Sequence, residues 1–268
     1  MCYYKGMKMK RVELLKYLEL ERAAEERQAE DDLQRTIHSG FEYKQVDIIV
    51  PKAGCKWDLV EMEWGFIPQY WWTRSDVEKN RKGYMDDKGK FHPPRTTLNA
   101  KGEELLLPGK MYRDAALNRR CLFPATDFFE WRHVFPMGKK GQPLKTAVKY
   151  PYRIAVKNSE VFFIAGIYQS WTDRETGETL DTCALVTTEA NELMKQVHNS
   201  KERMPTILTQ ELAGEWISDG LSEERIKEIA TFRIPPSQLE AHPVPKDFLQ
   251  LEDPRTQFEY EGLSALVI

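Results

Sequence analysis

The chain lacks several features that mark specialised classes of protein. Its 268 residues include only four cysteines, and because no two of them form a Cys-x-x-Cys pair, neither a disulfide framework nor a zinc site is expected. No apolar run approaches the ~20 residues needed to cross a bilayer, and the beginning of the chain lacks the continuous apolar segment of a signal peptide. It has no Gly-rich phosphate loop, internal repeat or low-complexity segment. We therefore expect a soluble, cytoplasmic protein that uses no metal or cofactor and makes no membrane contact.

Aromatic residues and unevenly placed charges are what the chain does have. Twelve Phe, eleven Tyr and seven Trp supply the bulk of a hydrophobic core. The net charge is only −3, but the segment from Arg95 to Lys149 carries eleven Lys/Arg against five Asp/Glu. Such a basic segment fits an anion-binding face, and it also fits an ordinary solvated surface, which is the commoner case.

The order of the expected elements predicts the fold class. Residues 11–37 favour a long, highly charged helix, and short strands follow between 41 and 72. The polar segment 73–97 contains two Gly and two Pro and is expected to be an exposed loop or excursion. Because helices and strands then alternate without a βαβ rhythm, we predict a single α+β domain over 1–268, with mostly antiparallel strands in a barrel-like sheet flanked by helices.

Patterns in the second half of the chain give more local predictions. A helix is expected to open within 97–106, with Asn99 just before it as a possible N-cap. Thr209 and Ser222 are expected to cap two further helices, 209–217 and 222–230. Strands are predicted at 121–133, 152–157, 161–171, 182–190 and 203–208, a hairpin tip at 134–145 and a short helix at 190–198.

Cys2 is the first candidate for chemistry because of its position. Removal of Met1, which a small second residue favours, would leave a thiol and an α-amine on one residue. The α-amine has an ordinary pKa of about 7.7–8.0, so a useful fraction is neutral near pH 7. Such an aminothiol can condense with an aldehyde, first to an imine and then, by intramolecular closure, to a thiazolidine. An ordinary cysteine near a chain terminus remains the alternative.

Three further residues are candidates for positioning and proton transfer. Glu130 lies among Phe128, Phe129 and Trp131, where partial desolvation would raise its pKa and suit it to acid–base work; a solvent-facing edge residue is the alternative. Asn99 is either a site residue or the helix cap named above. His198 closes a short helix, where it either complements the helix dipole or serves a site.

Taken together, these residues form a pattern that resembles the SOS response-associated peptidase (SRAP) family of abasic-site processing proteins. The motifs of the resemblance, which span residues 2–244, are Met-Cys at the start, WGFIPQYW (64–71), LNAK (98–101), RRCLFPATDFFEW (119–131), ALVTTEAN (184–191), VHNSKERMPTIL (197–208) and HPV (242–244). The chain departs from the family pattern in having Tyr3 and Tyr4 where Gly-Arg is usual, and Lys101 where Arg is usual.

The resemblance implies a DNA damage response function. It implies that Cys2 forms a stable thiazolidine with the ring-opened sugar of an abasic site in single-stranded DNA, with possible autoproteolytic removal of Met1. It further implies that Asn99 holds the Cys2 amine, that Glu130 shuttles protons and that His198 assists opening of the sugar. We expect DNA contacts from Trp64, Lys101, Lys110, Arg113 and Thr187. The protein would then be a monomer, nucleoid-associated when bound to DNA.

Two other functions fit the same residues. In an N-terminal-nucleophile peptidase or amidase, the Cys2 thiol would attack an amide and the α-amine would serve as the base. In a non-catalytic single-stranded DNA binding module, the aromatic residues would act as stacking platforms. An aldehyde-bearing oligonucleotide separates these readings, because only the first function gives a permanent band shift.

Overall fold

The computed structural model of the chain describes residues 2–18, 37–52 and 55–267. The α-helices within these residues are α1 (Arg11–Tyr17), α3 (Arg74–Lys82), α4 (Arg113–Asn118), α5 (Glu192–Val197), α6 (Gln210–Trp216) and α7 (Glu223–Ala230). The strands are β1 (Tyr4–Gly6), β2 (Ile37–Ser39), β3 (Gln45–Lys52), β4 (Cys55–Trp64), β5 (Tyr84–Met85), β6 (Phe91–His92), β7 (Asn99–Lys101), β8 (Arg120–Ala125), β9 (Asp127–Val134), β10 (Val148–Val156), β11 (Phe162–Thr172), β12 (Thr179–Glu189), β13 (Arg203–Pro205), β14 (Ile207–Leu208) and β15 (Leu239–Pro243).

Five strands close into a small barrel. The pairing runs β12-β4-β3-β8-β11 and returns from β11 to β12, and every pair is antiparallel except β4 with β12. Three short strands extend this sheet: β7 and β13 pair with β12, and β14 pairs with β11.

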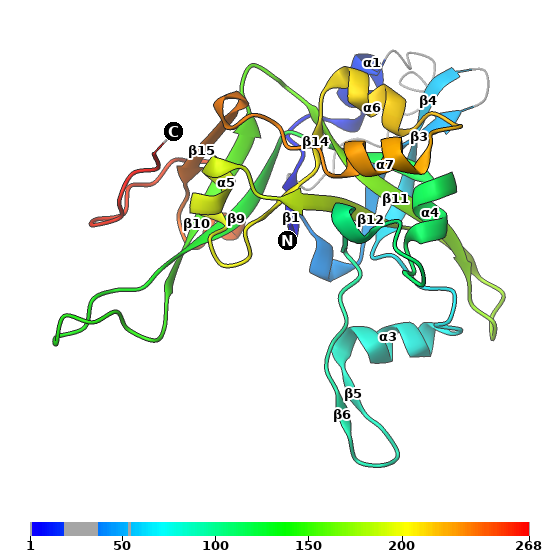
Figure 1. The fold of residues 1–268 in the computed structure, drawn as a ribbon, viewed down its shortest axis with the longest axis horizontal. Coiled ribbons are helices and arrows are strands. Elements are labelled where there is room, and N and C mark those ends of the chain that lie inside the picture. The colour runs from blue at the N-terminus through cyan, green and yellow to red at the C-terminus, as the bar shows by residue number, and fades with distance from the viewer. Residues whose placement is uncertain (1, 19–36, 53–54, 268) are drawn as a thin grey trace.

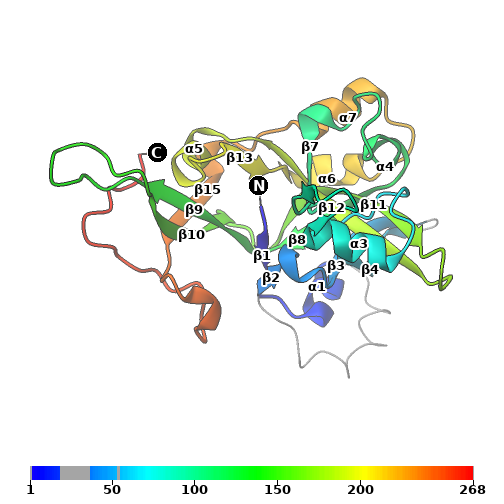
Figure 2. The ribbon, with the colours of Figure 1, turned by 90° about the horizontal axis from the view of Figure 1, so that it is seen from below.

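A second, antiparallel sheet has the order β15-β10-β9-β1-β2. The chain passes from the barrel to this sheet at Thr126, between β8 and β9. Strand β1 lies near the centre of the molecule, between the long β9–β10 hairpin and the barrel (Figures 1 and 2). The α+β class, with a barrel-like sheet and flanking helices, is confirmed.

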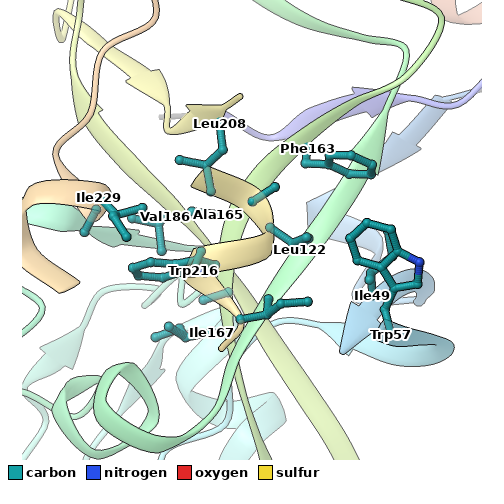
Figure 3. Packing of buried hydrophobic residues seen from close by; sticks show 14 of the residues in the cluster. Ile49, Trp57, Leu122, Phe163, Ala165, Ile167, Val186, Leu208, Trp216 and Ile229 are labelled. Atoms are coloured by element: carbon teal, nitrogen blue, oxygen red, sulfur yellow. The ribbon is translucent and has the colours of Figure 1, made fainter. Parts of the chain in front are cut away.

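The largest buried cluster packs α6 and α7 against the barrel (Figure 3). At its centre the Trp216 indole is fully buried, and its Nε1 donates to the carbonyls of Cys121 at 3.1 Å and Gly166 at 3.0 Å. These bonds join the helix to β8 and β11 while the ring fills the apolar space between them. Truncating such a side chain to Ala typically costs about 3–5 kcal/mol of folding stability. This cluster fixes the barrel, and through it β8 and the start of β9.

Several local predictions are confirmed. Thr209 and Ser222 cap α6 and α7, each accepting a hydrogen bond from the backbone N–H three residues later. The strands predicted at 152–157, 161–171 and 182–190 correspond to β10, β11 and β12.

Other local predictions were confirmed only in part or were wrong. The helix expected over 11–37 is confirmed at its start by α1, and residues 19–36 lie outside the described residues. Its expected end was wrong, because Ile37 belongs to β2. Asn99 does not cap a helix; it lies in β7, because pairing with β12 overrides the local helical pattern, and only a 3₁₀ turn follows.

The segment 73–97 projects from the body of the molecule as an excursion (Figure 1), but it contains α3 and the β5–β6 hairpin rather than a structureless loop. Thr73 and Asp76 form a capping box that starts α3. The pattern was missed because this helix buries only Val77 and Arg81 on its inner face.

None of the helices in the described ranges is both long and apolar enough to span a lipid bilayer.

Candidate active site

The beginning of the chain is held between two strands of the second sheet. Strand β1 pairs with β9 on one side and β2 on the other, so that Tyr4 lies opposite both Phe129 and Ser39. The N–H of Gly40 donates to the carbonyl of Tyr3 at 2.8 Å. Cys2 precedes these contacts directly and is completely buried. A residue that the sequence places near a terminus is therefore a fixed, interior residue.

The far end of β1 is anchored by a buried carboxylate. Asp127 is fully buried beneath Gly6 and accepts from Arg153 Nε at 3.0 Å and from Arg255. A Cβ added at Gly6 would lie 1.6 Å from Asp127 Oδ1, so only glycine permits this approach. The anchor fixes the position of β1 against β9, and with it the position of Cys2.

Glu130 faces the site because β9 alternates its side chains. Its neighbours Phe129 and Trp131 pack against Phe248, with ring centroids 4.7 and 6.1 Å from that of Phe248. Glu130 itself is only 4% exposed. Burial penalises its charged form and raises the pKa of its carboxyl to about 8, so the group is largely protonated at neutral pH.

His198 lies directly after α5 and opposite Glu130. Its Nδ1 is 2.8 Å from the carbonyl oxygen of Arg203, and because a carbonyl only accepts, Nδ1 carries the hydrogen. The lone pair of Nε2 therefore points toward Glu130 Oε2, 3.8 Å away. Burial lowers the pKa of His198 to about 4, so the ring is neutral at pH 7.

The pair is thus a neutral acid facing a neutral base. A separation of 3.8 Å is too long for a direct hydrogen bond, but one bound oxygen could contact both groups. Glu130 can donate a proton to such an oxygen, and His198 can accept one from it.

The Cys2 thiol is kept protonated by its surroundings. Burial and the nearby Glu130 carboxyl raise its pKa above the ordinary thiol value. Its Sγ lies 3.8 Å from the carbonyl oxygen of Tyr4, to which it can donate weakly. A cysteine that initiates attack as a thiolate needs the opposite shift, toward a lower pKa.

A pocket of about 350 Å³ opens onto Glu130 and His198, whereas Cys2 and Asn99 are not among its lining residues. Glu130, His198 and Tyr3 line it together with Trp131, His133, Lys149, Ser200 and Lys201. Asn199 holds one wall in place, since its side chain accepts from the His133 N–H at 2.9 Å and donates to the His133 carbonyl at 2.8 Å. The two lysines make the mouth of the pocket cationic, which favours an anionic ligand.

Asn99 lies in β7 and is 8% exposed. Its side-chain Nδ2 and Oδ1 are buried and have no hydrogen-bond partner within the described residues. The preceding Leu98 packs under Gly40, which contacts Tyr3 through the backbone bond given above. The segment that carries Asn99 thus packs near Tyr3 through Leu98 and Gly40, and the Asn99 amide has both its donor and its acceptor unused by the described residues.

The residues expected to contact DNA do not line the pocket. Trp64 is fully buried, with its Nε1 donating to the Leu98 carbonyl at 3.0 Å, so its ring offers no surface to a base. Thr187 is also fully buried, and Arg203 donates to its backbone carbonyl at 2.7 Å and to its hydroxyl at 3.2 Å. Packing in the interior therefore accounts for Trp64 in WGFIPQYW and for Thr187 in ALVTTEAN.

The three basic candidates of the same group are paired with acids. Lys101 and Lys110 both contact Glu104, and Arg113 contacts Glu223 at 2.6 Å. Exposed ion pairs of this kind leave little net positive charge for a phosphate.

Of the eight residues that line the pocket, sequence reasoning predicted only Glu130 and His198 as site residues. It missed Tyr3, Trp131, His133, Lys149, Ser200 and Lys201. Lys149 and His133 lie opposite each other in the β9–β10 register. Both residues lie in the basic segment 95–149, which was their only signal in the sequence. That segment did not show which of its eleven Lys/Arg lies at the site. No group of three or more His, Cys, Asp or Glu that could hold a metal ion occurs in the part of the chain that the structure describes.

Comparisons with known proteins agree on one family. A family model described as "SOS response associated peptidase (SRAP)" matches residues 1–250. The abasic site processing protein YoqW of Bacillus subtilis is 34% identical over 160 residues, covering 60% of this chain and 57% of that protein. YobE of the same organism, also named an abasic site processing protein, is 37% identical over 160 residues, covering 60% of this chain and 58% of YobE.

More distant similarity extends further along the chain. The abasic site processing protein HMCES of Gallus gallus is 25% identical over 203 residues, covering 69% of this chain and 52% of HMCES. The matched spans cover little more than half the length of these relatives. A crystal structure of a protein from Bacteroides thetaiotaomicron superimposes with a TM-score of 0.73 and 27% identity, covering 95% of this chain and 97% of that chain.

Proposed function

Because the chain belongs to the SOS response associated peptidase family, we propose that it acts in the response to DNA damage by processing abasic sites. Two bacterial relatives and one from a bird carry the name abasic site processing protein, which supports this assignment. We further propose that the protein crosslinks to the abasic sugar in single-stranded DNA through a thiazolidine at Cys2.

The chemistry needs two bond-forming steps at one carbon. The Cys2 α-amine, freed by loss of Met1, attacks the aldehyde carbon of the ring-opened sugar and forms a carbinolamine. Loss of its hydroxyl as water gives an imine. The thiol then adds to the same carbon, and its proton goes to the imine nitrogen. The net reaction joins aldehyde and aminothiol with release of one water.

The buried acid–base pair is the observation that carries this proposal. Protonated Glu130 would donate to the carbinolamine oxygen as water leaves, and neutral His198 would accept the proton of the sugar hydroxyl as the ring opens. Because the thiol of Cys2 is held protonated, it would add to the sugar carbon only after the imine has formed. Asn99, whose amide has no hydrogen-bond partner among the described residues, would orient the amine.

The raised thiol pKa weighs against a cysteine peptidase or amidase on foreign substrates, in which a thiolate initiates attack. A non-catalytic DNA-binding module would have no need of a buried, uncharged acid–base pair, whose burial costs folding stability.

The deciding experiment mixes the protein with an oligonucleotide that carries one abasic site, alongside the same sequence without it. We expect a denaturant-resistant shift with the abasic strand alone, and no cleavage of a peptide panel. In Cys2→Ala we expect the shift to disappear. Peptide cleavage without crosslinking would favour the peptidase, and equal, fully denaturable binding by both proteins would favour the binding module.

A further inference from the structure

The β9–β10 hairpin extends far beyond the second sheet. Backbone pairing between the strands ends at Val134 opposite Val148, and the chain continues through a separate bridge between Met137 and Pro143. Bonds from Gly138 N–H to the Gln142 carbonyl at 2.8 Å and from Leu144 N–H to the Pro136 carbonyl at 2.8 Å order this tip. In both views the tip stands clear of the body of the molecule (Figures 1 and 2).

The hairpin has an unusual charge. Residues 131–159 contain seven Lys/Arg and no Asp or Glu, although 42 acids among 268 residues would put about five in a stretch of this length. Four of its lysines, Lys139, Lys140, Lys145 and Lys149, are exposed and form no ion pair within the described residues. This contrasts with Lys101, Lys110 and Arg113, each of which forms an ion pair, the two lysines with the one carboxylate of Glu104 and Arg113 with Glu223.

Apolar side chains are exposed among these lysines. Phe135 is 51% exposed, Met137 65% and Leu144 49%. Solvated lysines alone are common on protein surfaces, but large apolar groups exposed beside uncompensated cations are a combination suited to the bases and phosphates of a single strand.

The hairpin also begins in the candidate site. Lys149 and His133 line the pocket and lie opposite each other in the β9–β10 register, next to the last strand pair before the projecting tip. A strand whose abasic sugar occupied the pocket would therefore meet Lys149 first, and the tip lysines farther along.

From this placement we propose that the β9–β10 hairpin is a second nucleic-acid contact, an arm that binds the single strand flanking the abasic site on one side. The lysines bind phosphates, and Phe135 supplies a stacking surface for a base. The proposal rests on the proposed function for the identity of the strand, but it concerns affinity and not the covalent chemistry.

The reach of the arm sets the length of DNA that it requires. Lys140 lies six positions after Val134, and at ~3.3 Å per residue these six steps span ~20 Å. At ~3.4 Å per nucleotide of one strand in duplex spacing, this is about six nucleotides. A flank of two nucleotides cannot reach the tip, and a flank of ten can.

The test compares strand lengths with a tetrahydrofuran abasic analogue, which has no aldehyde and so reports reversible binding alone. The strands are a 5-mer with two nucleotides on each side, a 21-mer with ten on each side, and two strands extended on the 5′ or the 3′ side only. The variants are Lys139→Ala/Lys140→Ala and Phe135→Ala. The matched control is Lys88→Ala/Lys90→Ala in the turn between β5 and β6, which removes two exposed lysines beside Asp86 and Asp87.

We expect the Lys139→Ala/Lys140→Ala variant to bind the 21-mer roughly tenfold more weakly, with a salt slope reduced by about 0.7 for each lost phosphate contact. Phe135→Ala should weaken it about fivefold or more. Binding of the 5-mer should stay within twofold, one of the two one-sided strands should reproduce the loss, and the control should bind all strands as the unaltered protein does.

If the variants lost equal affinity for the short and the long strands, or lost none for either, the proposal that the hairpin binds the flanking strand would be wrong. Unchanged affinity for every strand would also be the result if the hairpin served a protein partner instead. Failure of the proposed function looks different: the unaltered protein would then form no covalent adduct with an aldehyde-bearing abasic strand, whatever the length dependence of binding.

Discussion

Replacement of Glu130 by Gln tests the acid–base pair most severely. Gln keeps the size and neutrality of the protonated carboxyl but cannot give up a proton. We expect Glu130→Gln to slow crosslinking near pH 7 by about 10²-fold, the usual contribution of a general acid–base group. Reversible binding of the tetrahydrofuran strand should stay unchanged, because the substitution removes no positive charge.

The pH profile carries more information than the rate at one pH. Crosslinking requires a neutral α-amine, with an ordinary pKa of about 7.7–8.0, and a protonated Glu130, whose pKa is about 8. The product of the two fractions has its maximum near pH 8 and is roughly 20-fold lower at pH 6. The rate should therefore follow a bell, with the falling limb set by Glu130.

In Glu130→Gln the falling limb should disappear, because the group that titrates there is gone. Single-turnover crosslinking from pH 5.5 to 10, measured on denaturing gels, provides the profile. Glu160→Gln, at an exposed carboxylate with no ion pair in the described residues, is the matched control. A Gln variant that crosslinks at the unaltered rate, or that retains the falling limb, would remove Glu130 from the mechanism.

Further predictions concern stability, the amide and the thiol. The folded Glu130 carboxyl keeps its proton up to about pH 8 whereas the unfolded one loses it near pH 4.5, so its contribution to stability is lost as pH rises through this window. Thermal melts should therefore show that the stability of Glu130→Gln, relative to the unaltered protein, rises with pH, by as much as roughly 3 kcal/mol at neutral pH. An equal difference in melting temperature at pH 5 and pH 8 would contradict this. Asn99→Ala should slow crosslinking at least about tenfold. Urea titration should show stability changed by less than about 1 kcal/mol, since the Asn99 amide makes no hydrogen bond to the described residues, and a large loss of stability would make Asn99 structural. Cys2→Ser should give an imine that borohydride traps and no adduct that survives denaturation without it, and a denaturant-stable adduct from this variant would exclude the thiazolidine.

The sequence was sufficient for the residues whose role depends on local pattern. Alternation along β9 places Glu130 opposite Phe129 and Trp131, and the N-caps Thr209 and Ser222 follow from spacing alone. Such features are decided within a few residues, so a single chain displays them.

Features decided by distant partners could not be predicted in this way. Asn99 became part of a strand because β12, more than eighty residues later, pairs with it. Trp64 was taken for a surface contact, but its partner Leu98 and the ring of Phe123 enclose it. Likewise, the cations of the basic segment could be counted, but those in ion pairs could not be told from those without. The reason is that the carboxylates that pair with Lys110 and Arg113 are not adjacent to them in sequence.

The most direct measurement of the central proposal is the intact mass of the protein after mixing with an abasic single-stranded oligonucleotide. The protein should be prepared in two forms, one verified to begin at Cys2 and one retaining Met1, in which the nitrogen of Cys2 is an amide without a usable lone pair. We predict that the form beginning at Cys2 gives a denaturant-stable species with the summed mass less one water, and that the form retaining Met1 gives none. A stable adduct from protein that fully retains Met1 would contradict the thiazolidine and transfer the chemistry to another side chain.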